Sequence, residues 1–174
     1  MRHRHTLLGI ALAAAMVVPG CQFPTFTDPR AALELVEFQA QAEVVGDSVR
    51  FSLGVSNTSD EEVVYIGGAC GRRPVLRVYE LASGEPTLLW ESSRIARRIC
   101  ALSTAPSLVP HPVIPPGETF SVSGAEPVWL ILGDSIPAGA YTLSLGAHIA
   151  IEGAVLEREA SAGEVELATF DRVP

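Results

Sequence analysis

The chain has 174 residues, a formal net charge of −8 and no lysine. This length suits one domain with a sizeable hydrophobic core, and the 48% of hydrophobic residues can supply that core. The acidic balance argues against nucleic acid as a partner, because nucleic-acid binding needs clustered positive charge to displace counterions.

The first 21 residues are organised as an export signal. Arg2 and Arg4 give a positive start, residues 7–18 form an uncharged, mostly apolar run, and a small residue precedes Cys21. Twelve residues rise only about 18 Å as a helix, which is too short for a bilayer core of about 30 Å. The end of this segment resembles the bacterial lipobox, and the resemblance implies that residues 1–20 are cleaved and that Cys21 is lipidated.

Residues 21–32 then form the lipidated N-terminus and a short tether, which carries two prolines and no apolar periodicity. Residues 33–174 form one domain. Cleavage also removes two arginines, so that ten arginines face 20 acidic residues and the formal net charge falls to −10. Gln22 after the lipidated cysteine resembles the sorting pattern of outer-membrane lipoproteins. We therefore expect an exported protein, anchored by lipid at the periplasmic or outer face of the outer membrane.

Short runs with strand patterning follow along the domain. The first two form a predicted hairpin, in which apolar and polar residues alternate on both sides of a turn at Gly46 and Asp47. The predicted strands are 36–44, 49–55, 62–66, 74–81, 86–91, 119–123, 128–132, 139–151 and 164–169. Turns rich in Gly and Pro separate several of them, and residues 157–159 are interpreted as one more solvated turn. The sequence predicts an all-β, immunoglobulin-like antiparallel sandwich of about seven to nine strands.

Cys70 and Cys100 are the thiols that remain once Cys21 is lipidated. Two cysteines in an exported chain favour a disulfide. The alternative is a reactive or metal-binding pair, which is disfavoured because no His or further Cys lies near either one in the sequence.

The order of several short motifs resembles the immunoglobulin-like domain of the BsuPI-type intracellular proteinase inhibitors, over roughly residues 47–150. The motifs are Phe51-x-Leu-x-Val-x-Asn57-x-Ser59, Val75-Leu-Arg-Val-Tyr79, Leu89-Trp90-Glu-Ser, Ile114-Pro-Pro-Gly117-Glu and Pro137-Ala-Gly-Ala-Tyr141-x-Leu. The resemblance implies a sandwich fold and a capacity to bind other proteins. It also implies a second possible function, proteinase inhibition through an exposed loop around residues 94–116.

Arginines are concentrated in the segment between Cys70 and Cys100. Those outside the strand patterning are Arg72, Arg73, Arg94, Arg97 and Arg98, and Arg77 lies within a predicted strand. The planar guanidinium group pairs with carboxylates and phosphates at two points, so this segment could bind an anionic partner. In the alternative interpretation, these charges only protect strand edges and keep a long loop solvated.

Catalysis is not expected. His111 lies in a Pro-flanked loop and His148 on the polar face of a strand, and neither belongs to a zinc-protease or nucleophile-elbow motif. No calcium-loop motif is present in the sequence, so no metal or cofactor is expected. Trp90 and Trp129 fall in apolar runs and are predicted to be core residues rather than a platform for sugars. We expect a non-catalytic, lipid-anchored binding or scaffolding module whose partner is another envelope protein.

Overall fold

The computed structural model describes residues 34–68, 71–82, 85–94, 110–133 and 136–168. Within them the chain forms nine strands and one five-residue helix. In chain order these are β1 (Val36–Val45), β2 (Ser48–Asn57), β3 (Val63–Gly67), β4 (Val75–Ala82), β5 (Glu85–Glu91), β6 (Val113–Ile114), β7 (Thr119–Pro127), α3 (Val128–Leu132), β8 (Gly139–Ile151) and β9 (Ala154–Leu167).

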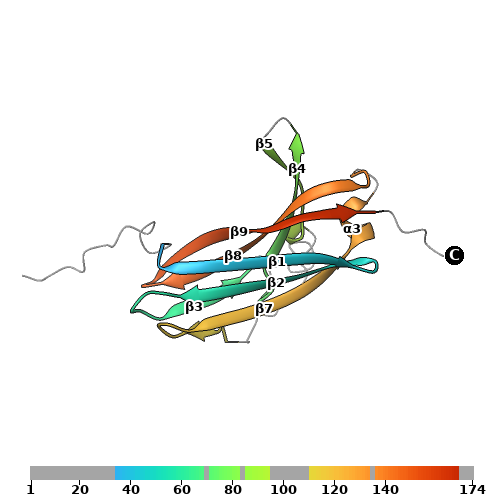
Figure 1. The fold of residues 1–174 in the computed structure, drawn as a ribbon. Coiled ribbons are helices and arrows are strands. Elements are labelled where there is room, and N and C mark those ends of the chain that lie inside the picture. Colours follow the sequence, from blue (N-terminus) through green and yellow to red (C-terminus); the bar gives the residue numbers. More distant parts are fainter. Residues whose placement is uncertain (1–33, 69–70, 83–84, 95–109, 134–135, 169–174) are drawn as a thin grey trace, which may run out of the picture.

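The strands form two antiparallel sheets that pack as a sandwich (Figure 1). Sheet A has three strands in the order β1-β2-β7. Sheet B has six strands and is built around β8, which pairs with β9 along one edge. The other edge of β8 is shared by β4 and β3, and β5 and β6 extend the sheet beyond them. The predicted all-β antiparallel sandwich of about seven to nine strands is confirmed.

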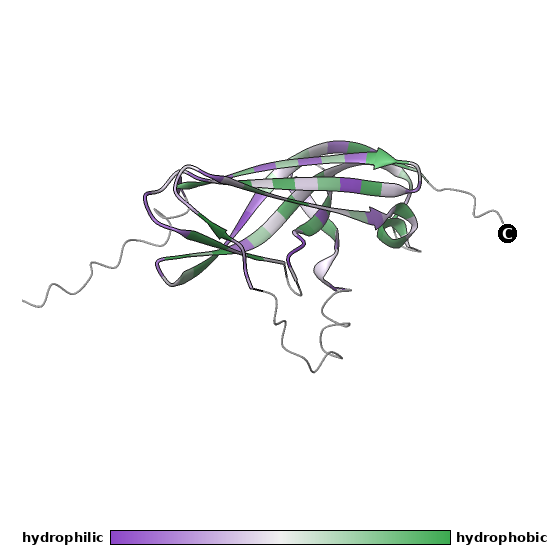
Figure 2. Cartoon of the chain, turned by 90° about the horizontal axis from the view of Figure 1, so that it is seen from below, coloured by the Kyte–Doolittle hydropathy of each residue, from purple (hydrophilic) through white to green (hydrophobic). Residues whose placement is uncertain are grey.

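The core lies between the two sheets and follows the alternation of the sequence. In β2 the odd-numbered residues from 49 to 55 are buried, and in β8 the odd-numbered residues from 141 to 151 are buried. Colouring by hydropathy shows the same alternation along the strands (Figure 2). Each aliphatic side chain that is fully buried in this way stabilises the fold by about 1.5–3 kcal/mol.

Asn57 connects the end of β2 to two other segments. Its Nδ2 donates to the carbonyl oxygens of Glu61 (2.7 Å) and Ile114 (2.9 Å), and its Oδ1 accepts from the backbone N–H of Ser59 (3.0 Å) and from its hydroxyl (2.6 Å). The residue is 1% exposed, and every polar atom of its side chain has a partner. The Asn-x-Ser motif therefore fixes the turn that leads from sheet A into sheet B.

Strand β9 lies alongside β1 and brings the two sheets together on one side of the sandwich (Figure 1). Arg158 of β9 donates to the backbone carbonyl of Val36, and its guanidinium carbon lies 5.9 Å from the ring centre of Phe38. The hydrogen bond to the Val36 carbonyl and the contact with the Phe38 ring both join β9 to β1 at this edge of the sandwich.

The prediction of a strand at residues 128–132 is wrong, because these residues form α3. A continuous apolar run has no periodicity that separates a strand from a buried helical turn. Val128, Ile131 and Leu132 are buried, at the spacing of one helix face, whereas Trp129 is 54% exposed. The expected core role of Trp129 is therefore also wrong, and Trp90 is only partly buried against the core.

The last strand is much longer than predicted, and residues 157–159 lie in the middle of β9 rather than in a turn. The turn is at Glu152 and Gly153, whose φ values are +49° and +81°. Two consecutive positive φ values are typical of the type I′ turn, which matches the twist of a hairpin. Residues 157–159 are three consecutive charged residues, which interrupt the alternation of apolar and polar residues along β9 and therefore favoured a turn.

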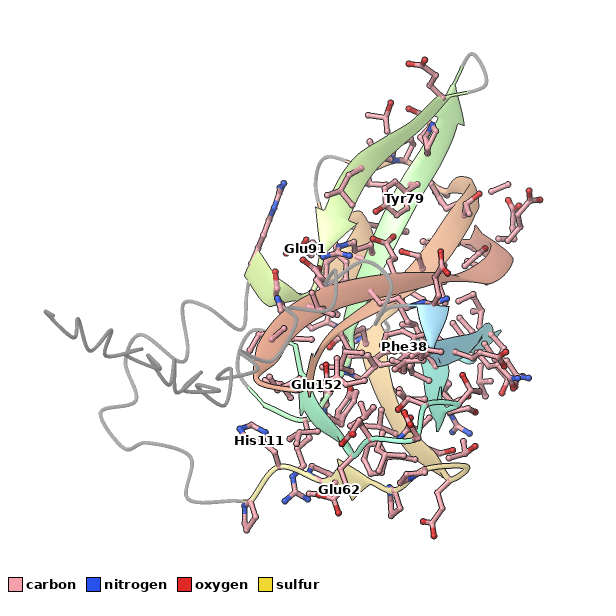
Figure 3. The ribbon with its side chains drawn as sticks, turned by 90° about the vertical axis from the view of Figure 1, so that its left-hand side faces the viewer. Phe38, Glu62, Tyr79, Glu91, His111 and Glu152 are labelled. Atoms are coloured by element: carbon pink, nitrogen blue, oxygen red, sulfur yellow. The ribbon has the colours of Figure 1, made fainter. Side chains whose placement is uncertain are left out.

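Strands β4 and β5 form a hairpin that projects beyond the rest of both sheets (Figures 1 and 3). The four residues from Glu85 to Leu88 are exposed, and the three from Leu89 to Glu91 are half-buried. A bulge in the pairing lies between Val78 and Tyr79 of β4. The root of this hairpin, where Tyr79 and Glu91 lie, holds the most developed polar cluster of the described residues.

Candidate functional site

Several residues singled out from the sequence lie outside the described residues. They are Cys21, Cys70, Cys100, Arg97 and Arg98. Lipidation, the disulfide and the role of these two arginines therefore stay predictions.

The remaining predicted arginines are exposed. Arg72 and Arg73 lie between β3 and β4, and Arg94 follows β5. One guanidinium nitrogen of Arg72 donates to the carbonyl oxygen of Pro110 at 2.5 Å, which ties this connection to the segment before β6. The connection is tightly packed, since a Cβ added to Gly67, where φ is +88°, would lie 2.3 Å from the carbonyl oxygen of Gly71.

Arg77 of β4 is the centre of the polar cluster on the outer face of sheet B. Its Nε lies 3.1 Å from a carboxylate oxygen of Glu91 on β5, and its Nη1 lies 2.5 Å from a carboxylate oxygen of Glu159 on β9. Its Nη2 donates to Glu157, also on β9. The arginine side chain is only 13% exposed. Through its three ion pairs, the guanidinium group of Arg77 on β4 connects this strand to β5 and β9. We call these four residues the Arg77 cluster.

Two hydroxyl groups complete the surroundings of Glu159. Tyr79 donates from its hydroxyl to a carboxylate oxygen of Glu159 at 2.8 Å, and Ser144 of β8 donates to the same oxygen. Gly146 lies beneath the guanidinium group, where a Cβ would be 2.6 Å from Nη1 of Arg77. A glycine at this position of β8 therefore lets the arginine lie flat across the strand.

These contacts change the pKa values of Glu159 and Arg77. Burial alone raises the pKa of the Glu159 carboxyl, but the hydrogen bonds from Ser144 and Tyr79 and the charge of Arg77 lower it below its ordinary value. Burial alone lowers the pKa of Arg77, and the glutamates around it raise the pKa well above its ordinary value. Arg77 and Glu159 are therefore both charged at neutral pH.

The charge of the cluster does not balance, because three carboxylates surround one guanidinium group. The side chains of Glu157 and Glu159 are 43% and 35% exposed, so part of their negative charge faces solvent. Nε2 of His148 lies 3.9 Å from Glu157, on the polar face where the sequence placed this histidine. The outer face of sheet B is thus acidic at the root of the hairpin.

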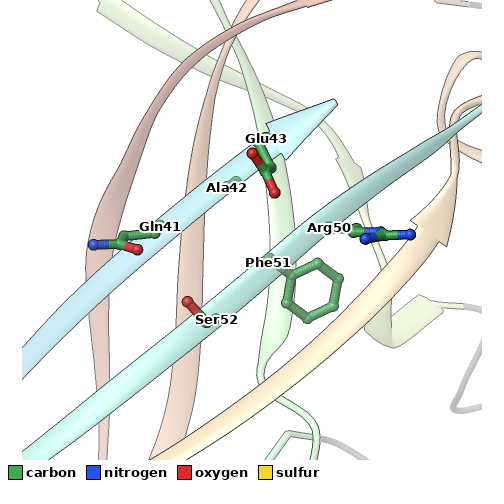
Figure 4. A pocket seen from close by; sticks show the side chains of 6 residues that line it. All are labelled: Gln41, Ala42, Glu43, Arg50, Phe51 and Ser52. Atoms are coloured by element: carbon green, nitrogen blue, oxygen red, sulfur yellow. The ribbon is translucent and has the colours of Figure 1, made fainter. Parts of the chain in front are cut away.

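An open hollow of about 440 Å³ lies over this cluster. Its lining combines the cluster with Tyr79, Leu88 and Arg158. Figure 3 shows Tyr79 and Glu91 at the root of the hairpin. A second hollow, of about 330 Å³, is lined by residues 41–43 of β1 and 50–52 of β2 (Figure 4). Both strands of that hollow belong to one hairpin, and its position away from the Arg77 cluster makes it the weaker candidate.

The sequence indicates Arg77 as one of several clustered arginines, but it does not indicate the partners of Arg77. The prediction of a turn at Glu157 and Glu159 is wrong, and their spacing of two residues is the spacing of one strand face. Arg77 is 80 and 82 residues away from them in the chain. The contact depends on the pairing of β4 and β9 with β8, which the sequence does not specify.

The Arg77 cluster is built from charged side chains and the hydroxyl groups that donate to them. The described residues contain no group of three His, Cys, Asp or Glu side chains that could hold a metal ion. In the same part of the chain, no helix is long and apolar enough to cross a membrane. The glutamates of the cluster hold Arg77 and face solvent, which is an arrangement suited to attracting a cationic group.

Comparisons with known proteins show limited likeness. No family model matches the chain, and no curated protein matches it. Among solved structures, a Northeast Structural Genomics Consortium target is similar with a TM-score of 0.41 and 10% identity, over 80% of this chain and 91% of that chain. The ApaA protein from Bordetella pertussis is similar with a TM-score of 0.39 and 14% identity, over 79% of this chain and 95% of that chain. A β-glucosidase from Listeria innocua is similar with a TM-score of 0.30 and 11% identity, over 74% of this chain and 16% of that chain.

Proposed function

We propose that this chain is a non-catalytic binding or scaffolding module, held at the membrane of a bacterial envelope by a lipid on Cys21. The export signal, the lipobox-like cysteine and Gln22 support export and an outer-membrane destination. About 14 residues separate Cys21 from the start of β1, and an extended chain of that length reaches at most about 50 Å. The sandwich can therefore stand clear of the lipid surface and meet another envelope protein.

The observation that carries the binding role is the projecting β4–β5 hairpin. Strands β4 and β5 extend beyond the body of the sandwich (Figure 1), and the root of the hairpin is held to β9 by the Arg77 cluster. A projecting element that is fixed at its root loses little conformational entropy when a partner binds it. Nucleic acid is not the partner, because the domain is acidic.

The experiment is a crosslinking pull-down from native membranes with the full-length chain, beside a Cys21→Ser variant. We expect one recurrent envelope protein at stoichiometric yield, and only when the anchor is intact. Mass spectrometry of the purified chain should find the lipid on Cys21. Recovery of no specific protein, together with an unmodified Cys21, would contradict the proposal.

Proteinase inhibition is the second function implied by the family resemblance, and the same experiment separates it. The loop in question spans residues 94–116, of which 95–109 lie outside the described residues. Capture of a protease, with loss of its activity in the complex, would replace the scaffolding role by inhibition.

A further inference from the structure

A row of apolar residues crosses the outer face of sheet B near the β8–β9 turn. It runs over the neighbouring strands β6, β3, β8 and β9, and its members are paired with one another in register. In that order they are Val113, Val64, Ala150 and Val155. Neighbouring strands lie about 4.8 Å apart, so the row is about 14 Å long. We call these four residues the apolar row.

The side chains of the apolar row point away from the core. The residue next to each of them in its strand belongs to the core or packs against it: Val63, Ile114, Ile149 and Leu156. Val113 is 50% exposed and Val155 is 60% exposed, and the two members between them are half-buried. A sheet that packs on the core with one face normally presents polar residues on the other, so a continuous apolar row there marks a contact surface.

Acidic residues border the apolar row on both sides. Glu62 and Glu152 come directly beyond the last pair of β3 and β8, and both are exposed. Figure 3 views the sandwich from the end that holds them and labels both. On the other side of the row, Glu157 follows Val155 on the same face of β9, and its side chain is 43% exposed. One carboxylate oxygen of Glu157 pairs with Arg77, and the other lies 3.9 Å from His148.

These borders decide which partner fits the apolar row. An amphipathic helix presents an apolar stripe with polar residues on either side, and about nine residues of helix span 14 Å. Basic residues beside that stripe would meet Glu62 and Glu152 on one side of the row and Glu157 on the other. A second copy of this chain would bring acidic borders together, and an anionic lipid surface would repel them, so both are disfavoured.

We propose that the apolar row binds an amphipathic helix of a partner protein, and that the apolar stripe of this helix is bordered by arginine or lysine. The helix lies across the four strands, with its apolar side chains on the two exposed valines and its basic side chains beside the glutamates. This surface belongs to other strands than the β4–β5 hairpin, so the inference goes beyond the proposed function. It gives the module a second contact surface, which a scaffolding role requires.

The test uses the full chain in phosphatidylcholine nanodiscs and a defined probe, a helical peptide of about 14 residues in which a leucine stripe is bordered by lysines. Empty nanodiscs measure how much of the probe binds to lipid. We expect calorimetry to show binding to the chain that weakens as salt rises. A peptide of the same composition without the stripe, and the stripe peptide with glutamate for lysine, should each bind about tenfold more weakly. Equal binding of the three peptides would overturn the proposal.

Two pairs of variants locate the probe on the protein. Val155→Thr keeps a β-branched residue in the strand but replaces a methyl group by a hydroxyl, so it should weaken probe binding about fourfold. Val45→Thr makes the same change at an exposed valine of β1 and should leave the affinity unchanged. Glu152→Gln should weaken binding about threefold, whereas Glu43→Gln, on β1, should not. Equal effects of the two members of either pair would overturn the proposal.

Other occupants give different results. A concentration-dependent dimer in sedimentation that Val155→Glu abolishes would make a second copy the occupant. Flotation of the Cys21→Ser chain with anionic vesicles, lost on adding Val155→Glu, would make a lipid surface the occupant. Tighter probe binding in the Ile99→Ser, Leu102→Ser double variant would make this chain's own segment the occupant. Each of these results overturns the proposal, whereas the proposed function is tested by the membrane pull-down and stands if only the probe fails to bind.

Discussion

Tyr65 is a buried residue whose hydroxyl has no hydrogen-bond partner among the described residues. The side chain is 0% exposed, and its ring centre lies 5.0 Å from that of Phe120. Burial raises the pKa of this phenol well above its ordinary value. The ring contributes to the core, but the hydroxyl has lost water without gaining a partner among the described side chains and backbone groups.

Tyr65→Phe should therefore leave the free energy of unfolding unchanged or raise it by about 1 kcal/mol. Tyr141→Phe is the matched control, because the Tyr141 hydroxyl donates to the carbonyl oxygen of Pro137 at 2.7 Å. The control should lose about 1 kcal/mol. Urea unfolding of the two variants measures both values, and an equal loss in both would contradict this account of Tyr65.

Glu159 gives the domain a dependence on pH. Because its pKa is lower in the folded state than in the unfolded chain, it contributes stability above the unfolded value of about 4.3. This contribution is lost as the pH falls through the lower, folded value. As the pH falls through this range, the free energy of unfolding should decrease less for Glu159→Gln than for the wild type. Urea unfolding at a series of pH values measures both decreases.

Tyr79→Phe removes one of the hydrogen bonds that lower the pKa of Glu159, so its acid dependence should be intermediate. Identical acid profiles for the wild type and Glu159→Gln would show that the Arg77 cluster does not control stability in acid.

At the scale of the elements, the turn between β8 and β9 holds a residue in a backbone conformation that favours glycine or asparagine. Glu152 has a φ of +49°. Glu152→Asn should raise the free energy of unfolding by about 0.5–1 kcal/mol, because asparagine adopts this conformation more easily. Gly153→Ala, at a φ of +81°, should lower it by about 1 kcal/mol or more. Thermal unfolding of both variants checks these opposite signs, and a loss in both would contradict the type I′ assignment.

The connection after β2 depends on Asn57. Asn57→Ala removes four hydrogen bonds from a buried side chain and leaves backbone groups without partners. We expect a loss of about 3 kcal/mol in the free energy of unfolding. Thr58→Ala, which removes one exposed hydrogen bond to Leu35, should cost less than about 1 kcal/mol. Comparable losses in urea unfolding would mean that Asn57 is not central to this turn.

Elements with strict alternation and a glycine turn could be predicted from the sequence. The predicted bounds of the β1–β2 hairpin agree with the structure to within two residues, because alternate side chains of both strands are less exposed than their neighbours. The helix α3 could not be predicted, since its apolar run has no period that excludes a strand. The Arg77 cluster was also out of reach, because its contacts span some 80 residues and depend on which strands pair.

For the whole molecule, the two sheets have different roles. Sheet A and the inner face of sheet B enclose the core, and the wider sheet B carries the projecting hairpin and the acidic cluster on its outer face. The N-terminal lipid would fix the location of the domain, and the hairpin would select what binds to it. Export and partner binding are separate properties in this account, and each can be tested alone.

The most direct test is site-specific photo-crosslinking in cells that make the full-length chain. A photoreactive residue replaces Leu88 on β5, and in a second strain it replaces the exposed Gln39 on β1. The account predicts one discrete crosslinked envelope protein from position 88 and none from position 39. The same partner from both positions, or none from position 88, would contradict binding through the β4–β5 hairpin.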